Sequence, residues 1–490
     1  MSALTHGSSR FLWNGCAVSF WPGDSIAAAL YRNGIRTLAS TRKRHLPLGF
    51  SGAYLQGVLG RVDGRPNVRL DLEPAADGLK VSAQNTWPCA RFDLLRLARW
   101  LPSRWLRGGF EHPRLFPGGT RRFQAWERIL WHLAGVARPA ARSSAPSCPV
   151  GRRVDVDVLV VGGGPQGRRF ANEAAAAGHR VALACRSAVP GAFARAMGVP
   201  LPEIDSRVEV VSGTEVFGVY REGTLAAGAP HDHRSGATVF SMRQLMLAVG
   251  KRSMPPLVPG AHLPGVMDAH SALRLAHDHG VRLGGAVAVL GTGGETEIAQ
   301  RIESLGTPVV HCGSIRELRR VEGYGSVRGI LVNARIACDA VVHCGPWAAD
   351  PSLDFQAACE GLIRLTPGAS AERVVVAKSA EQGDQSFMIG TEGLKEALVC
   401  PCMDVTAGEV LERIAGGETD PEELKRATSC GMGPCQGMPC WLAMAALIDS
   451  RTIPGDSPGA QDLRPSFRPP RRAITVAQAA ALHGLVDPDR

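Results

Sequence analysis

The middle of the chain carries apolar stretches of strand length, each followed by a turn of glycines and a helical segment. Val154–Val161 has the apolar pattern of a buried strand and leads into the glycine-rich turn 162–167. An alanine-rich helical segment follows at 171–177, and a second apolar strand at 180–184. Because strand, glycine turn, helix and strand occur in this order, the sequence predicts a βαβ unit on a parallel sheet.

A second strand–turn–helix pattern lies further along, at 286–290 and 291–296, and the apolar run 373–377 predicts a last strand for the first sheet. The small residues at 248–250 resemble the segment where two-dinucleotide-binding-domain flavoproteins cross between domains. This resemblance implies an α/β, Rossmann-like fold. Its domains would be a FAD-binding domain split into 154–275 and 366–395, and an inserted NAD-type domain at 276–365.

Residues 10–90 show short strand patterns around one helix. Asp24–Gly34 predicts a helix with Asp24 as its N-cap, and Asp63-Gly64 is a hairpin turn signal. This order resembles the plant-type, β-grasp ferredoxin domain of sarcosine oxidase α-subunit-like proteins. The resemblance implies a ferredoxin fold without its cluster, because the four cysteine positions of that domain fall on other residues. Those positions are Gly49, Tyr54, Gly57 and Asp71.

The turn 162–167 has the composition of a dinucleotide-binding turn. Gly162 suits a tight turn, Gly164 lets the backbone approach a pyrophosphate, and Gly167 lets the helix pack closely on the sheet. The helix N-terminus then offers N–H groups to the diphosphate. A glycine-rich turn without a ligand is the alternative. The predicted cofactor contacts are Gly162, Gly163, Gly164, Pro165, Gln166, Gly167, Cys185, Ala248 and Gly250.

Three departures from the dinucleotide-binding pattern weaken the expected nucleotide sites. Cys185 replaces the acid that binds the adenosine ribose, and a thiol lacks the two charged acceptors of a carboxylate. Residues 377–379 lack the Gly-Asp pair by which flavoproteins of this fold hold the ribityl chain. In the insert, Thr296 replaces the third glycine, which predicts weak or no NAD(P)H binding. We expect FAD at 162–167, with NAD there, or FMN at an interface, as alternatives.

Five of the thirteen cysteines lie between residues 400 and 440. Such a cluster, in a sequence without export-signal features, indicates a metal or iron–sulfur site rather than disulfides. Thr406–Glu409 predicts a capping box, and Asp420-Pro421 predicts the start of a second helix. Two cysteine-bearing loops would therefore flank a pair of helices.

The segment 396–450 resembles the bacterioferritin-associated-ferredoxin-like [2Fe-2S] domain of the flavin subunits of hydrogen cyanide synthase, opine oxidase and hydroxyproline dehydrogenase. That domain is small and helical. The best ligand set on this pattern is Cys400, Cys402, Cys430 and Cys435, with Cys440 as a spare thiol. Structural zinc, which also accepts four thiolates, is the alternative.

Composition adds an interaction surface to this picture. The 490 residues are 45% hydrophobic and 20% charged, which suits several packed domains and excludes bulk disorder. The net charge of +10 arises largely in the connector 91–153, where arginines are mixed with Trp100, Trp105, Trp126 and Trp131. Arginine with large aromatics is typical of protein interfaces. An anionic membrane surface is the second interpretation, and nucleic-acid binding is disfavoured because charges elsewhere nearly balance.

Most of the chain resembles the α-subunits of heteromeric flavin-dependent amine or amino-acid dehydrogenases and oxidases. This resemblance implies an oxidoreductase subunit that passes electrons from a partner, a FAD-dependent amine or amino-acid oxidase-like subunit that acts on a small-molecule amine. No catalytic residue is predicted on this chain. The alternatives are a scaffold with a decayed flavin site and a self-sufficient NAD(P)H-dependent reductase.

The two ends of the sequence carry the remaining expectations. Residues 451–490 are predicted to be a C-terminal tail. The first residues lack a signal-peptide pattern, and no apolar run reaches the roughly 20 residues of a membrane span. We therefore expect a cytoplasmic protein, with peripheral contact at the inner face of the membrane as an alternative.

Overall fold

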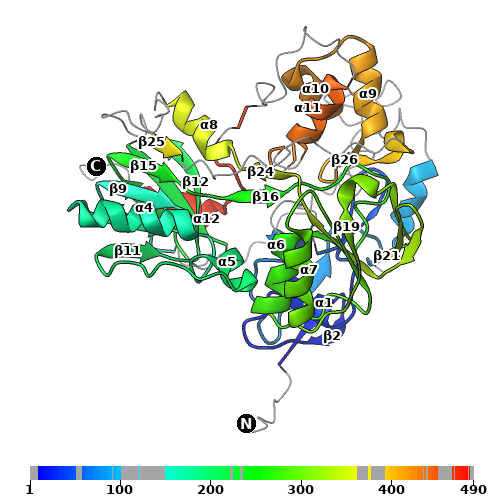
Figure 1. Ribbon diagram of the computed structural model, residues 1–490, viewed down its shortest axis with the longest axis horizontal. Coiled ribbons are helices and arrows are strands. Elements are labelled where there is room, and N and C mark those ends of the chain that lie inside the picture. Colours follow the sequence, from blue (N-terminus) through cyan, green and yellow to red (C-terminus); the bar gives the residue numbers. More distant parts are fainter. Residues whose placement is uncertain are drawn as a thin grey trace. The chain divides into compact units, whose positions relative to one another are not determined.

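The computed structural model describes residues 9–50, 58–90, 92–100, 121, 149–220, 224–231, 235–360, 374–376, 392–433, 435–437, 440–450, 466–467, 469–483 and 485. The chain divides into two compact units (Figure 1). Unit 1 comprises 1–143, 253–346 and 384–465, and unit 2 comprises 144–252, 347–383 and 466–490. The crossings at 252/253 and 346/347 precede the boundaries expected from sequence, 275/276 and 365/366. They coincide with a two-stranded pair, β16 (Lys251–Ser253) and β24 (Trp347–Ala349).

Unit 2 contains the predicted βαβ unit. Its five-stranded sheet has the order β11-β10-β9-β15-β25, and all of the pairings are parallel. The strands are β9 (Val158–Val161), β10 (Val181–Ala184), β11 (Val208–Val211), β15 (Gln244–Leu247) and β25 (Val374–Val376). Helix α4 (Pro165–Ala176) joins β9 to β10, and α5 (Ala192–Met197) follows β10.

The alternation of side chains along β9 places the sheet between two cores. Val158 and Val160 pack with the alanines of α4, whereas Leu159 and Val161 pack with a second, four-stranded sheet. That sheet has the order β12-β13-β14-β8. Its strands are β12 (Thr214–Tyr220), β13 (Leu225–Pro230), β14 (Thr238–Ser241) and β8 (Arg152–Asp155).

The prediction of one strand over 154–161 is wrong, because the chain changes sheets at residues 156–157. Val156 N still donates to Ser241 O in the second sheet, whereas Asp157 N donates to Arg180 O in the first. The Asp157 carboxylate accepts from Arg180 N at 2.9 Å and fixes this change of partner. A continuous apolar pattern does not reveal such a switch, since both halves are buried strands.

The C-terminal segment is docked on unit 2. Arg471 N donates to Phe217 O at 2.8 Å, and the Arg472 guanidinium donates to Ala229 O at 2.6 Å. The Arg471 guanidinium pairs with Glu215, and α12 (Val476–Ala480) follows. The described part of 451–490 is therefore part of a domain rather than a free tail. Helix α8 (Ser352–Cys359) contributes Leu353 to the same core.

The N-terminal part of unit 1 is a mixed sheet, β2-β1-β7-β5-β6, with helix α1 (Ile26–Arg32). The strands are β1 (Arg10–Trp13), β2 (Cys16–Ser19), β5 (Leu59–Val62), β6 (Arg65–Arg69) and β7 (Lys80–Ala83), with the short pair β3 (Ala39–Ser40) and β4 (Pro47–Leu48). The hairpin at Asp63-Gly64 is confirmed. Ser25, not Asp24, is the N-cap of α1, because the Asp24 carboxylate is taken by Arg32 at 2.9 Å.

The inserted domain is also in unit 1. Its parallel sheet β17-β23-β18-β19 consists of β17 (Val266–Asp268), β23 (Ala340–Cys344), β18 (Val287–Gly291) and β19 (Val309–Ser314). The helical segments are α6 (Ala269–Leu273), η2 (Arg274–Asp278) and α7 (Glu295–Ser304). An antiparallel sheet follows, with β20 (Arg320–Gly323), β21 (Val327–Leu331) and β22 (Arg335–Ala337).

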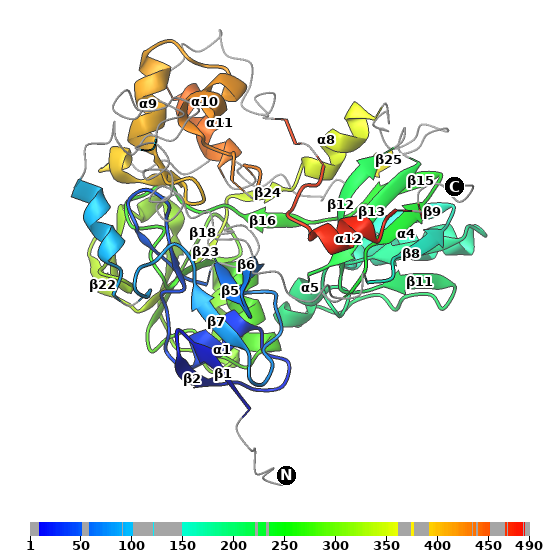
Figure 2. The same cartoon turned by 180° about the vertical axis from the view of Figure 1, so that it is seen from behind.

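The cysteine-rich segment forms a small helical group in unit 1, seen from two sides in Figure 1 and Figure 2. The predicted capping box at Thr406 and Glu409 and the N-cap at Asp420 are confirmed. The elements are η4 (Leu394–Glu396), β26 (Leu398–Cys400), β27 (Val405–Thr406), α9 (Ala407–Ala415), α10 (Pro421–Thr428) and α11 (Trp441–Asp449).

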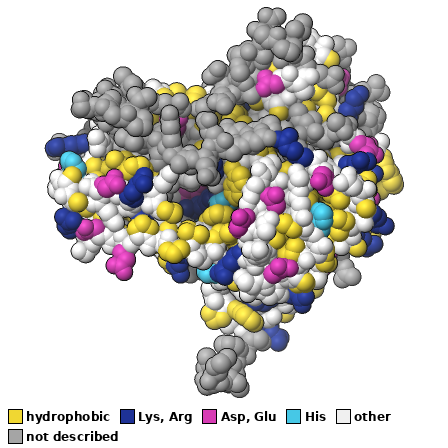
Figure 3. Space-filling model, in the orientation of Figure 1, with side chains coloured by type: hydrophobic (Ala, Val, Ile, Leu, Met, Phe, Trp, Pro, Cys, Tyr) yellow, Lys and Arg dark blue, Asp and Glu magenta, His cyan; other side chains and the backbone are white. Residues whose placement is uncertain are grey.

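Most of the connector 91–153 falls outside the described residues, including Trp105, Trp126 and Trp131, so its role as an interface stays a prediction. Its first part is η1 (Leu94–Trp100). On the face drawn in Figure 3, dark blue and magenta side chains are interspersed over the coloured part of the surface. No helix in the described part of the chain is long and apolar enough to cross a bilayer.

Candidate cofactor sites

The glycine turn in unit 2 lies between β9 and α4, where two glycines are required by packing. Gly162 has φ +115°, and a Cβ added to it would lie 2.2 Å from Ala248 O. A Cβ on Gly167 would lie 1.8 Å from Gly162 O. A Cβ on Gly164, in contrast, would have no other atom within 4 Å. The turn is therefore closed at Gly162 and Gly167 and open at Gly164, where a ligand could approach the backbone.

The open glycine is also the N-cap of α4, with Pro165 and Gln166 in the first turn. No side chain caps this end of the helix, and its partial positive charge favours an anion such as a diphosphate. Gly163 lies against Pro190, which is 2.6 Å from an added Cβ. Ala248 and Gly250 follow β15, and Gly250 has φ +72°. The predicted contacts thus gather at one end of the sheet, and their role in cofactor binding stays a prediction.

Arg168 holds this turn in place and was missed by the sequence analysis. Its guanidinium donates to Gly163 O at 3.2 Å, to Pro190 O at 2.9 Å and to Pro202 O at 2.8 Å. It therefore ties the glycine turn to the segment that follows β10. An arginine placed directly after the third glycine was the available signal.

Cys185 directly follows β10, at the position where an acid was expected. Its thiol is buried and lies 3.3 Å from Ser187 O, to which it donates. Burial raises the pKa of the Cys185 thiol, so this side chain is neutral at pH 7. It offers a nucleotide ribose no charged acceptor. The change of 377–379 lies outside the described residues.

The corresponding turn of the insert is occupied by a side chain of the protein itself. Glu295, the first residue of α7, accepts from Gly293 N through Oε2 at 2.8 Å. A Cβ on Gly291 would lie 2.6 Å from the same oxygen. This carboxylate takes the helix N-terminus that would bind a diphosphate and would repel it. The geometry disfavours NAD(P)H at this turn.

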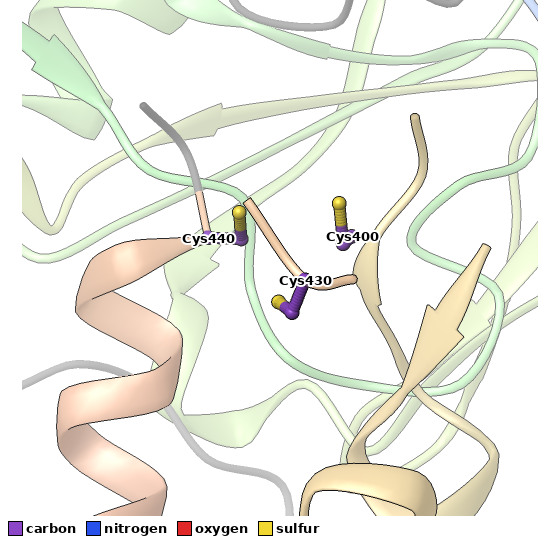
Figure 4. A group of neighbouring side chains, drawn as sticks. All are labelled: Cys400, Cys430 and Cys440. Atoms are coloured by element: carbon purple, nitrogen blue, oxygen red, sulfur yellow. The ribbon is translucent and has the colours of Figure 1, made fainter. Parts of the chain in front are cut away.

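Three cysteine sulfurs converge in the small helical group. The sulfur atoms of Cys400, Cys430 and Cys440 all lie within 4.8 Å of one another, and Figure 4 shows the side chains coming from three separate segments. Cys400 ends β26, Cys430 follows α10, and Cys440 precedes α11 as its N-cap. Ser429, with φ +65°, ends α10 and turns the chain so that Cys430 is buried.

The other two predicted ligands form a neighbouring pair, with Cys402 Sγ 3.5 Å from Cys435 Sγ. All five thiols are buried. The ligand set Cys400, Cys402, Cys430 and Cys435 stays a prediction. Cys440, which the sequence analysis left as a spare thiol, is a fifth candidate because it lies in the converging group. Its place at the start of an apolar helix was the signal that could have included it.

The three converging thiols are linked to one another by hydrogen bonds. The thiols of Cys430 and Cys440 donate towards the Cys400 sulfur, which holds the pKa of Cys400 well below its usual value. The same contacts raise the pKa of Cys430 and Cys440. A Cβ on Gly433 would lie 2.5 Å from Cys402 Cβ, so the second loop approaches the first closely. A soft, buried set of thiols fits a [2Fe-2S] cluster, and its chemistry also fits zinc.

The N-terminal domain offers no such fit at the two cluster positions that the structure describes. A Cβ on Gly49 would lie 2.8 Å from both Cα and Cβ of Pro264 and 2.9 Å from Arg36 O. Asp71 is fully buried, and its carboxylate pairs with Arg69 at 2.6 Å. Protein atoms therefore fill the two described positions where the resemblance would place thiolates. The other two positions, Tyr54 and Gly57, lie outside the described residues.

Comparison with known families finds a domain of a [2Fe-2S]-binding family towards each end of the chain. A 2Fe-2S iron-sulfur cluster binding domain matches residues 9–86, and a BFD-like [2Fe-2S] binding domain matches residues 398–450. The structure is similar to that of L-proline dehydrogenase from P. horikoshii, with a TM-score of 0.73 and 19% identity, over 97% of this chain and 98% of that chain. At this identity the likeness shows the fold, and it confirms the predicted α/β flavoprotein fold.

Subunits of two oxidases are similar in sequence. The alpha subunit of sarcosine oxidase from Rhizobium meliloti (strain 1021) is 28% identical over an alignment of 362 residues, and the match covers 67% of this chain and 36% of the relative. A subunit of opine oxidase from the same strain is 37% identical over 86 residues, 17% of this chain and 18% of the relative. The corresponding opine oxidase subunit of Agrobacterium tumefaciens (strain Ach5) is 33% identical over 91 residues, 18% of each chain.

The matched regions thus span little more than a third of the first relative and less than a fifth of the others. The relatives are subunits of oxidoreductases, and the predicted cofactors, a [2Fe-2S] cluster and FAD, agree with them and with the matched domains. The chain is a homologue of these sarcosine oxidase and opine oxidase subunits, with a flavoprotein dehydrogenase fold between two ferredoxin-type domains.

Proposed function

We propose that this flavin-dependent oxidoreductase subunit transfers electrons within a heteromeric amine or amino-acid dehydrogenase or oxidase. The observation that carries the proposal is the presence of five buried cysteine thiols in two neighbouring groups, on a chain that also keeps an open dinucleotide turn at Gly164. When bound, FAD accepts two electrons and a [2Fe-2S] cluster carries one, which would couple amine oxidation to single-electron acceptors.

The residues of this chain have binding and positioning roles in the proposal. The N-terminus of α4, with its N-cap Gly164, would hold the diphosphate of FAD, and Arg168 keeps the turn in shape. Four of the five cysteine thiolates would hold the cluster. Burial of these thiols keeps water away from the site. Cys185 leaves the ribose with a weaker partner than a carboxylate, so we expect looser binding of FAD than in a protein with an acid there.

The substrate amine would be oxidised on a partner, a FAD-dependent amine or amino-acid oxidase-like subunit. The names of the relatives support this division, since both oxidase relatives are called subunits, and those names and that of the solved structure refer to sarcosine, opines and L-proline. The described residues support it too. The thiols of the converging group are buried and suited to a metal. The turn at Gly164 is open to a nucleotide, whereas the turn of the insert at Gly291 is closed by Glu295.

The neutral thiol at Cys185 favours one second candidate, a scaffold subunit whose flavin site has decayed. A self-sufficient NAD(P)H-dependent reductase is disfavoured by Glu295. Flavin extraction from this chain, purified apart from its FAD-dependent partner, separates the proposed function from the scaffold.

The test is anaerobic reduction of the complex purified with its partner subunit. We expect an amine or amino-acid substrate to produce the electron paramagnetic resonance (EPR) signal of a reduced [2Fe-2S] cluster only when the partner is present. NADH should produce no signal with the isolated chain. Reduction of the isolated chain by NADH would contradict the proposal and favour the reductase.

A further inference from the structure

A loop of the N-terminal ferredoxin-like domain holds the segment that follows Cys402. Asp404 is fully buried, and its Oδ2 accepts from Thr41 Oγ1 at 2.5 Å, from Lys43 N at 3.0 Å and from Arg44 N at 2.6 Å. Its Oδ1 accepts from Arg44 Nη1 at 2.8 Å. Four donors from one loop therefore fix a carboxylate two residues after a predicted cluster ligand.

The holding loop, residues 41–45, is itself rigidly placed. Asn85 Nδ2 donates to Thr41 O at 2.7 Å, and Leu46 N donates to Thr41 Oγ1 at 2.9 Å. The His45 ring lies 3.1 Å from a carboxylate oxygen of buried Asp93. Such a loop can fix the position of another segment, because its own backbone is already set by hydrogen bonds.

Arg44 joins the cysteine loop to the first turn of α9. Besides Asp404, it contacts Glu409 Oε1 through Nη2 at 3.2 Å, and Glu409 belongs to the capping box of α9. The Arg44 side chain is mostly buried, with 22% of its surface exposed. Two acidic residues on the cysteine-bearing segment thus share one guanidinium from the ferredoxin-like domain.

The charges around this contact affect how easily a cluster at the neighbouring cysteines would accept an electron. Asp404 and Glu409 are negative, and Arg44 and Lys43 are positive; Lys43 Nζ lies 3.9 Å from Glu409 Oε1. Burial lowers the pKa of His262, which also lies in the field of Asp404, to about 4, so it is neutral at pH 7. Arg42 Nη1 lies 3.3 Å from Met403 Sδ and adds a further positive charge. Without Arg44, the buried Asp404 carboxylate would oppose the addition of an electron to a cluster at the neighbouring cysteines.

We propose that Arg44 is a positioning residue for the cluster site, which fixes the Cys400–Asp404 loop and compensates the charge of Asp404. The ferredoxin-like domain, whose own positions at Gly49 and Asp71 are filled by protein atoms, then acts on the cluster of the other domain by setting its reduction potential. This inference rests on the proposed cluster in the 400–440 segment.

The test is a redox titration of the EPR signal in the full chain with its cluster. Arg44→Gln leaves Asp404 uncompensated and should make the midpoint potential more negative. Asp404→Asn removes the negative charge and should make it more positive. We expect each shift to be on the order of a tenfold change in the one-electron equilibrium, about 59 mV, and the double variant to lie between them, near the unsubstituted chain. Arg44→Lys should keep most of the original potential.

Arg207→Gln is the matched control, since it removes the same charge from an exposed pair with Asp205 in unit 2. It should not change the potential. If Arg44 had a structural role alone, Arg44→Gln and Asp404→Asn would both disturb the loop and shift the midpoint potential in the same direction. That result would overturn the inference. If the Arg44→Gln variant holds no cluster, the Asp404→Asn variant alone tests the inference. A more positive midpoint potential supports it, and a more negative one overturns it. An unsubstituted chain without a [2Fe-2S] signal would overturn the proposed function itself, and this inference with it.

Discussion

The ferredoxin-like domain at 9–86 and the BFD-like domain at 398–450 both match [2Fe-2S]-binding families, but they differ at the ligand positions. In the first, Gly49 is packed against Pro264, and Asp71 is paired with Arg69. In the second, five buried thiols lie in two neighbouring groups. The N-terminal fold is kept by an apolar core that includes Phe11, Ile26 and Val81, and this core needs no metal. An apolar core of this kind can hold a ferredoxin-type fold together without a cluster.

The largest effect is expected from the cysteines of the second domain. Cys400→Ala removes the sulfur on which the thiols of Cys430 and Cys440 converge, and four thiolates are needed for a cluster. Iron and acid-labile sulfide should fall to near zero after anaerobic purification. Cys16→Ala, which removes an exposed thiol of the first domain, should leave both unchanged. Equal loss of iron and sulfide in the two variants would show that the two domains do not differ in cluster binding.

The next effect concerns the dinucleotide turn. Gly164→Val should abolish flavin binding, because a side chain at the open position blocks the diphosphate. The midpoint of urea unfolding, measured without flavin, should hardly change, since the extended backbone at φ −73° and ψ −177° accepts a β-branched residue. Gly167→Ala should lower that midpoint strongly, because its Cβ would lie 1.8 Å from Gly162 O. Retained flavin in Gly164→Val would place the cofactor elsewhere.

A smaller effect is expected where a ligand position of the first domain has been filled. Gly49→Ala should lower the free energy of unfolding by about 1–3 kcal/mol through overpacking against Pro264 and Arg36. Gly285→Ala is the control, since its Cβ would meet only Asp339 Oδ2 at 3.4 Å. Denaturant titration measures both. An unchanged free energy of unfolding in Gly49→Ala would mean that the position still has room for a ligand side chain.

The smallest effect is expected at Cys185. Cys185→Glu restores a charged acceptor for the ribose, and its gain of about 1.5–3 kcal/mol is partly offset by the cost of burying the carboxylate. Flavin should bind roughly tenfold more tightly, as measured by titration of the apoprotein. Cys185→Gln has the same length without the charge and should give a smaller gain. No change in either variant, with no flavin in this chain purified apart from its partner, would favour the scaffold.

The local signals in the sequence were sufficient to predict the motifs but not their partners. The glycine turn, the capping box at Thr406 and the N-cap at Asp420 each depend on a few neighbouring residues, so their patterns were readable. The switch of sheets at Asp157 and the docking of Arg471 on Glu215 depend on residues far apart in the chain. The same holds for Cys440 and for the contact of Arg44 with Asp404. Spacing alone does not reveal such encounters, because they are fixed by packing between distant segments.

We expect only one of the two ferredoxin-type domains to hold a cluster. The most direct test is the iron and sulfide content of the full chain, purified without oxygen, together with its zinc content and EPR spectrum. We predict roughly two iron atoms and two sulfides per chain, as one [2Fe-2S] cluster requires, with a single EPR species after reduction. Roughly four irons with two species would mean that both domains hold a cluster, and zinc in place of iron would mean that neither does; either result would contradict this expectation.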